Sequence, residues 1–150
     1  MKLTSFKVTP PLRTKEDIEA LIKRVNDGTI DVICSDHTPE DIENKQCEFD
    51  NAAFGMLNLQ TSFAAANSTG KIDINDLIVK MTSAPRTVLG LTNPTIKVGE
   101  KANLTMFSPN LKSILTTKEI LSKAKNSPFI GKELTGKVYG VINNDKMNIS

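Results

Sequence analysis

Metal-binding and aromatic side chains are scarce in this sequence, and their scarcity excludes several kinds of site. Its 150 residues include no tryptophan, one tyrosine, one histidine and two cysteines. One histidine, two separated cysteines and scattered carboxylates do not supply three or four zinc ligands at a recognisable spacing. Cys34 and Cys47 form no CxxC pair, so both are expected to be reduced thiols. The residue pattern therefore predicts no zinc site built within this chain.

Long apolar runs, an export signal and a strong charge bias are also missing. No run approaches the roughly 18 apolar residues of a membrane span, and the first residues lack the apolar stretch of a signal peptide. The net charge of +2 is small and the basic residues are scattered, which argues against nucleic acid or a membrane as partner. Phosphate-binding GxGxxG and GxxxxGKS/T motifs and the hydrolase GxSxG motif are absent. We expect a cytoplasmic protein.

The first part of the chain has the helix and strand pattern of an α/β domain. Thr14 and Asp17 match a capping box ahead of apolar residues at helical spacing, and Gly28 follows as a helix stop. The apolar run 30–35 then predicts a buried parallel strand. Three more helices are expected from caps and apolar spacing, over residues 54–66, 73–84 and 85–89. Up to residue 91 the pattern is that of the end of an alternating α/β domain.

Beyond residue 91 the pattern changes to short strands. Three strands are expected around glycine turns, at residues 96–100, 102–107 and 136–143. Thr116 and Glu119 match a second capping box, which predicts a helix over residues 116–125. Residues 92–150 are therefore expected to form a small β-rich segment.

The strongest local signal is the polar sequence after the apolar strand, Ser35-Asp36-His37-Thr38-Pro39. In parallel α/β proteins the loops that follow the strands converge on the active site. There the carboxylate of Asp36 can bind a metal or act as a general base, and equally it can cap the following turn. His37, the single histidine, is more typical of a structural hydrogen-bonding residue than of a metal ligand. The pattern alone leaves both roles of Asp36 open.

A series of short stretches follows in a recognisable order along the chain. They are K-V-T-P-P-L-R from Lys7, D-G-T-I-D from Asp27, S-D-H-T-P from Ser35, E-N-K from Glu43, F-G and L-Q-T between residues 54 and 61, A-P-R from Ala84, G-E-K-A-N-L from Gly99, N-S-P-F from Asn126 and G-K-V from Gly136. Together they resemble the bacterial type of dihydroorotase within the amidohydrolase superfamily. The resemblance runs from about Phe6 to Asn144.

This resemblance implies a fold and an activity. The implied fold is α/β: the C-terminal part of a (β/α)8 TIM barrel in residues 1–91, followed by part of a small β-sandwich domain in residues 92–150. The implied activity is that of a zinc-dependent hydrolase of pyrimidine biosynthesis, which interconverts dihydroorotate and carbamoyl aspartate. In such enzymes a zinc-bound water or hydroxide attacks the carbonyl of the ring.

The resemblance also assigns roles to individual residues. Asp36 matches the catalytic aspartate that binds one zinc ion and carries the proton, with His37 and Pro39 as structural neighbours. The residues that match substrate-binding positions are Thr9, Glu40, Ala53, Phe54 and Gly55. Two of them depart from the family pattern: Glu40 stands where a histidine usually reaches the substrate, and Thr9 stands where an asparagine is frequent.

The other zinc ligands of the family, a His-x-His pair, a carboxylated lysine and two later histidines, would precede Lys7. We therefore expect zinc in the complete enzyme, none stably bound by this chain alone, and no activity without the metal-binding half. One alternative is a non-catalytic dihydroorotase-like scaffold, for example for aspartate carbamoyltransferase, which Glu40 favours. Another is one half of a split enzyme. The expected partners are accordingly the missing N-terminal half, a second copy of the chain or aspartate carbamoyltransferase.

The single histidine leads to a first prediction. The purified and dialysed chain is expected to hold no binuclear zinc centre, since one histidine and scattered carboxylates cannot complete one. Elemental analysis of the dialysed chain provides the measurement. Two equivalents of zinc per chain would contradict the prediction.

Overall fold

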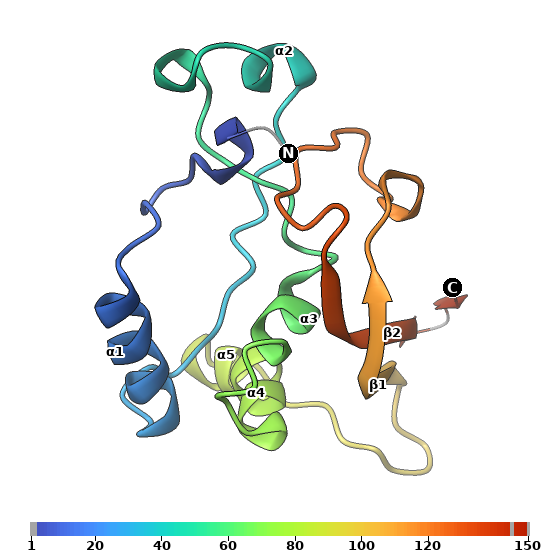
Figure 1. Cartoon of the computed structure of the whole chain (residues 1–150). Coiled ribbons are helices and arrows are strands. Elements are labelled where there is room, and N and C mark those ends of the chain that lie inside the picture. Colours follow the sequence, from blue (N-terminus) through green and yellow to red (C-terminus); the bar gives the residue numbers. More distant parts are fainter. Residues whose placement is uncertain (1–2, 145, 150) are drawn as a thin grey trace.

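The computed structural model describes residues 3–144 and 146–149, which form short helices and one antiparallel sheet (Figure 1). The helices are α1 (Lys15–Asn26), α2 (Ile42–Lys45), α3 (Ser62–Asn67), α4 (Ile74–Met81) and α5 (Ser83–Val88). The strands are β1 (Asn103–Ile114), β2 (Glu133–Asn143) and β3 (Lys146–Ile149). Short 3₁₀ turns lie at Leu3–Phe6, Phe49–Asn51 and Thr117–Glu119. Within these described ranges no helix is long and apolar enough to cross a membrane.

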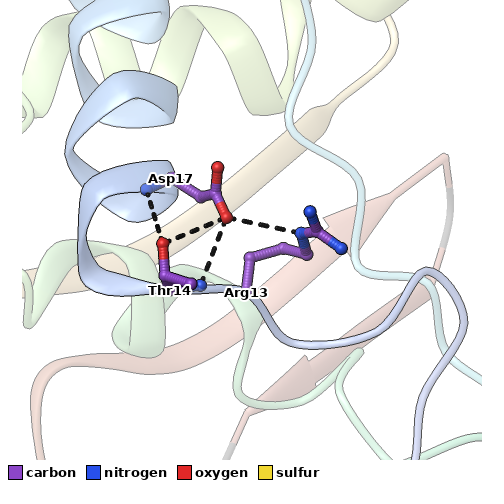
Figure 2. Close-up of polar contacts among 3 residues, drawn as sticks. All are labelled: Arg13, Thr14 and Asp17. Atoms are coloured by element: carbon purple, nitrogen blue, oxygen red, sulfur yellow. Dashed lines mark hydrogen bonds and ion pairs between the residues drawn. The ribbon is translucent and has the colours of Figure 1, made fainter.

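Helix α1 begins at the capping box that the sequence predicted. The hydroxyl of Thr14 accepts a hydrogen bond from the Asp17 amide, and the Asp17 carboxylate accepts one from the Thr14 amide, both at 3.3 Å. Figure 2 shows this pair, with the Arg13 guanidinium 3.4 Å from the same carboxylate. The helix ends before Gly28, whose φ of +82° is the left-handed conformation that favours glycine. The predicted first helix is confirmed.

The predicted strand over residues 30–35 is not formed as a strand among the described residues. Figure 1 shows this stretch as a long uncoiled segment between α1 and α2. It is held at isolated points: the Ile33 amide donates to the Lys80 carbonyl at 3.0 Å, and the Lys80 ammonium donates to the Ile30 carbonyl at 2.5 Å. A strand needs a ladder of backbone bonds to a neighbour. The described part of the chain offers this segment no such neighbour.

The helix expected over residues 54–66 begins only at Ser62, as α3. The preceding backbone is irregular because its amides bond elsewhere: the Leu57 amide donates to the Asn126 carbonyl, and the Asn58 amide to the His37 ring. Amides bonded in this way are not available to a helix ladder. The helices expected over residues 73–84 and 85–89 are confirmed as α4 and α5, with one-residue to three-residue differences at their ends.

The sheet has the order β1-β2-β3, with both pairs antiparallel. Asn103 pairs with Asn143 at one end of the first ladder and Ile114 with Glu133 at the other. The strands expected at residues 102–107 and 136–143 are confirmed and are longer than predicted. The strand expected at residues 96–100 is wrong, since this stretch is exposed and carries no strand.

The helix expected over residues 116–125 is reduced to a single 3₁₀ turn. Its capping box does form: the Glu119 carboxylate accepts from the Thr116 amide and hydroxyl at 2.8 and 2.7 Å. Beyond the turn, the side chain of Gln60 donates to the Glu119 carbonyl at 2.7 Å and accepts from the Leu121 amide at 3.1 Å. A continuing helix would need both of these backbone groups. A side chain distant in sequence therefore ends it.

The core between α3 and the sheet is small. Phe63 of α3 packs edge-to-face on Phe107 of β1, with ring centroids 4.9 Å apart. Gly136 of β2 allows this approach, because a Cβ there would lie 2.8 Å from the Phe63 ring. Leu77 of α4 is the largest fully buried side chain. Exposed large apolar side chains occur on α1, around the end of α5 and on the sheet; examples are Ile18, Leu21, Val88, Leu89, Met106, Val141 and Met147.

This exposure leads to a prediction about the isolated chain in solution. Residues 30–35 have no neighbouring strand among the described residues, and many large apolar side chains are exposed. Both features are expected to drive association, because unpaired extended backbone and exposed apolar surface are interaction sites. Size-exclusion chromatography with light scattering over a concentration series should show a mass that rises with concentration. A monomer at every concentration that binds no hydrophobic dye would show that the prediction is wrong.

Candidate functional site

The two segments that carry most candidate residues, 35–40 and 53–58, are held side by side. The Thr38 amide donates to the Met56 carbonyl at 3.1 Å, and the Asn58 side chain donates to the Ser35 carbonyl at 2.8 Å. Gly55 lies against Thr38 so closely that a Cβ at Gly55 would meet the Thr38 carbonyl oxygen at 2.7 Å. With a φ of +132°, Gly55 also has a backbone conformation that other residues rarely adopt. Glycine is therefore required at this contact.

Asp36 lies at the end of the extended segment and has a left-handed backbone, with a φ of +44°. For an L-residue this conformation costs on the order of 1 kcal/mol, although aspartate tolerates it better than most. Its side chain is exposed. The neighbouring contacts of Ser35 and His37 hold the backbone on both sides of it. Strain of this kind that is maintained by surrounding contacts is common at functional sites.

The His37 ring links residues 35–40 to the backbone at Asn58 and Leu59. Its Nδ1 atom accepts hydrogen bonds from the Asn58 and Leu59 amides at 3.2 and 3.1 Å. A ring nitrogen that accepts carries no proton, so in the neutral ring the proton is on Nε2. The two bonds to the imidazole therefore restrain the backbone of the loop after Gly55.

Glu40 is joined to this arrangement through Asn126 of the β-rich segment. The Glu40 amide donates to Asn126 Oδ1 at 3.2 Å, and Asn126 Nδ2 donates to the Gly55 carbonyl at 3.3 Å. The Glu40 carboxylate accepts from the Asn44 side chain at 3.2 Å. The sequence had placed Asn126 only in a family-like stretch and gave no sign of this bridge.

Two lysines tie the N-terminal segment to the same loop. Lys45 is buried, 4% exposed, and its ammonium donates to the carbonyls of Thr4, Lys7 and Ala53 at 3.0, 3.4 and 2.7 Å. Burial lowers the pKa of Lys45 below its usual value, while the nearby Glu40 carboxylate acts to raise that pKa. The satisfied donors make this buried ammonium tolerable.

Lys7 holds the other side of the loop. Its ammonium donates to the Phe49 and Asp50 carbonyls at 2.9 and 2.8 Å and lies 4.8 Å from the centre of the Phe54 ring. Its own carbonyl accepts from the Gly55 amide at 2.9 Å. Sequence reasoning did not single out either lysine. Their long apolar stems and charged ends resemble those of ordinary surface residues until the tertiary contacts are known.

The structure thus brings together two of the segments that carry predicted site residues, Asp36, His37, Pro39 and Glu40 on one and Ala53, Phe54 and Gly55 on the other. From the N-terminal segment it is the carbonyl of Lys7 that contacts them, by accepting from the Gly55 amide. Thr9 is exposed and joined to Pro10 by a cis peptide bond. Beside them lies a cavity of about 570 Å³, with Glu40, Lys45 and Asn126 among its lining residues. A second cavity of about 450 Å³ borders His37.

The described residues do not complete a metal site. Across residues 3–144 and 146–149, no three His, Cys, Asp or Glu side chains lie close enough together to hold a metal ion. Asp36 supplies a single carboxylate, whereas zinc sites use three or four protein ligands. A zinc ion therefore does not fit the residues that this part of the chain provides by itself.

Comparison with known sequences agrees with the family resemblance of the short stretches. The sequence pattern of the Amidohydrolase family matches residues 8–147. The dihydroorotase of Thermoanaerobacter sp. (strain X514) is 42% identical over 139 residues, which are 90% of this chain and 32% of that protein. The dihydroorotase of Clostridium acetobutylicum is 40% identical over 148 residues, 96% of this chain and 35% of that protein. The chain spans about a third of the length of these curated relatives.

Solved structures give a consistent picture of the fold. The D-hydantoinase (dihydropyrimidinase) from Thermus sp. superposes with a TM-score of 0.83 at 22% identity, over 97% of this chain and 34% of its own. The L-hydantoinase (dihydropyrimidinase) from Arthrobacter aurescens gives 0.81 at 25% identity, over 94% and 33%. The inactive dihydroorotase-like domain of the Chaetomium thermophilum CAD-like multifunctional protein gives 0.60 at 20%, over 96% and 41%. This chain therefore belongs to the amidohydrolase family, as its resemblance to dihydroorotases predicted.

Proposed function

We propose that this chain is the C-terminal portion of a dihydroorotase-type cyclic amidohydrolase and forms one wall of its active site. The observation that carries the proposal is the junction at Asp36, where an apolar extended segment ends in a strained carboxylate residue beside the Gly55 loop. In this proposal residues 30–35 are the last strand of a (β/α)8 barrel. Its neighbouring strands belong to the part of the relatives that lies outside the match.

Asp36 suits the proton transfers that hydrolysis of a cyclic amide requires. Water must lose a proton as it adds to the ring carbonyl, and the ring nitrogen must gain one as the C–N bond breaks. A carboxylate fixed beside the reacting atoms can accept the first proton and donate it in the second step. This chain supplies a single candidate metal ligand. The zinc of the proposed complete enzyme would therefore need its other ligands from the part of that enzyme that this chain does not match.

The electrostatics of the Gly55 loop suit an anionic substrate such as dihydroorotate or carbamoyl aspartate. The Lys45 ammonium is 2.7 Å from the Ala53 carbonyl, and the Lys7 ammonium lies over the Phe54 ring. Both cations contact the loop, and the buried Lys45 charge is only weakly screened by salt. The Glu40 carboxylate opposes them and weakens binding of an anion.

The proposal predicts a large effect of removing the Asp36 charge. The test uses a hybrid protein. In it, this chain is joined to the two thirds of a related dihydroorotase that the chain does not match. Asp36→Asn in the hybrid is expected to lower kcat for dihydroorotate hydrolysis by about 100-fold or more, the usual scale for loss of a general base. Steady-state kinetics with dihydroorotate measure it.

Asp76→Asn serves as the matched control, because Asp76 is an exposed aspartate of α4, outside the candidate site. It makes the same chemical change and should leave kcat within about twofold of the unmodified hybrid. Equal activities for the Asp36 variant and the unmodified hybrid would exclude Asp36 as the proton carrier.

A second candidate function, a non-catalytic dihydroorotase-like scaffold, is favoured by Glu40. If Glu40 reflects catalytic decay, the unmodified hybrid should have little activity, and Glu40→His should raise it by removing a charge that repels the substrate. Glu43→His is the control, as Glu43 is exposed in α2, three residues further along the chain. Family-like rates in the unmodified hybrid would reject the scaffold. Equal gains from both histidines would show that the position of Glu40 has no special role.

A further inference from the structure

The side chain of Asn126 connects two backbone segments that carry candidate site residues. Its Oδ1 atom accepts from the Glu40 amide at 3.2 Å, and its Nδ2 atom donates to the Gly55 carbonyl at 3.3 Å. Its backbone carbonyl accepts from the Leu57 amide at 3.2 Å. The amide orientation follows from these partners, because a backbone N–H can only donate and a carbonyl can only accept. Three bonds from one residue therefore fix the spacing between the two segments.

Asn126 is itself held in place within the β-rich segment. It is 7% exposed and followed by the buried Ser127 and Pro128. The Ser127 amide donates to the Lys125 carbonyl at 3.0 Å, and the Lys125 ammonium donates to two further carbonyls, those of Ile120 and Ser122, at 2.7 Å each. A buried amide with a restrained backbone can act as a fixed reference for what it binds.

Gly55 needs such an outside restraint. Glycine adopts many backbone conformations at little cost, so its own chain does not fix the direction of its peptide groups. Here the Gly55 amide donates to the Lys7 carbonyl at 2.9 Å, and its carbonyl accepts from Asn126. Without the Nδ2 donor, one of these two restraints disappears and the peptide after Gly55 can rotate.

We propose that Asn126 is a positioning residue of the active site, which orients the Gly55 backbone relative to the segment that carries Asp36 and Glu40. The inference rests on the proposed function, since Ala53, Phe54 and Gly55 are the segment proposed to bind the substrate. In this proposal the β-rich segment helps to position the site through Asn126 and takes no part in the reaction chemistry.

The first experiment uses the 150-residue chain and Asn126→Asp, which keeps the shape and the acceptor for Glu40 but places an oxygen against the Gly55 carbonyl. Amide hydrogen exchange followed by NMR is expected to be about tenfold faster at Gly55 relative to Leu77, because a Gly55 segment released at its carbonyl opens the bond from the Gly55 amide to the Lys7 carbonyl more often. Leu77 is the reference because it is fully buried in α4. Asn126→Ala gives the same measurement if the aspartate variant does not fold.

Asn67→Asp is the matched control. Its amide donates to the Pro109 and Thr135 carbonyls at 2.8 and 2.9 Å, away from the candidate site. This variant loses comparable bonds and should leave the Gly55 to Leu77 exchange ratio unchanged. Equal ratios in the Asn126 and Asn67 variants would overturn the proposal, because the effect would then be one of general stability.

The second readout separates positioning from a purely structural role. In the hybrid enzyme, Asn126→Asp should raise KM for dihydroorotate about tenfold while kcat changes much less, and Asn67→Asp should leave KM unchanged. Faster exchange at Gly55 with an unchanged KM would overturn the site role. A hybrid without activity would count against the proposed function instead, and the exchange ratio would still decide whether Asn126 orients Gly55.

Discussion

The buried ammonium of Lys45 is the interaction on which the arrangement of the site depends. It gathers the carbonyls of Thr4 and Lys7, from the N-terminal segment, and that of Ala53, from the loop at Gly55, around one charged group. A buried charge without such partners would cost several kcal/mol, so the two segments and the ammonium stabilise one another. The hydroxyl of Thr4 closes the set by donating to the Lys45 carbonyl at 2.7 Å.

Hydrogen bonds from side chains to the backbone of another segment occur both at the site and away from it. His37, Gln60, Asn67 and Asn126 each bond backbone groups of another segment, and within the described residues no buried side-chain nitrogen or oxygen lacks a partner. Such bonds are directional, so they specify where a loop lies more sharply than apolar contacts do. A loop proposed to present its backbone to a substrate benefits from this kind of support.

Local signals in the sequence predicted the elements that local interactions build. The capping box at Thr14 and Asp17 and the cap at Asp73 correctly located α1 and α4. The errors in the helices arose where distant groups compete for the backbone: Gln60 ends the turn after Glu119, and His37 prevents an earlier start of α3. Periodicity cannot reveal such bonds, because their partners are tens of residues away. The segments that carry Asp36 to Glu40 and Ala53 to Gly55 do lie together. Lys45 and Asn126 stood only within family-like stretches, and nothing in those stretches indicated that they hold the segments in place.

The stretch from residue 89 to residue 101 is exposed along its whole length, and the contacts that join the two parts of the chain lie elsewhere. Hydrogen bonds of Asn126, Gln60 and Asn67 join the two parts, together with the packing of Phe63 on Phe107. The connection keeps the two parts at high local concentration, and it does not determine the structure of either part. We expect proteases to cleave the chain there first, and insertions or a circular permutation to be tolerated at the same place. The two parts can in this way be exchanged between relatives as modules, provided that the incoming β-rich part also has an asparagine at the position of Asn126, which restrains Gly55.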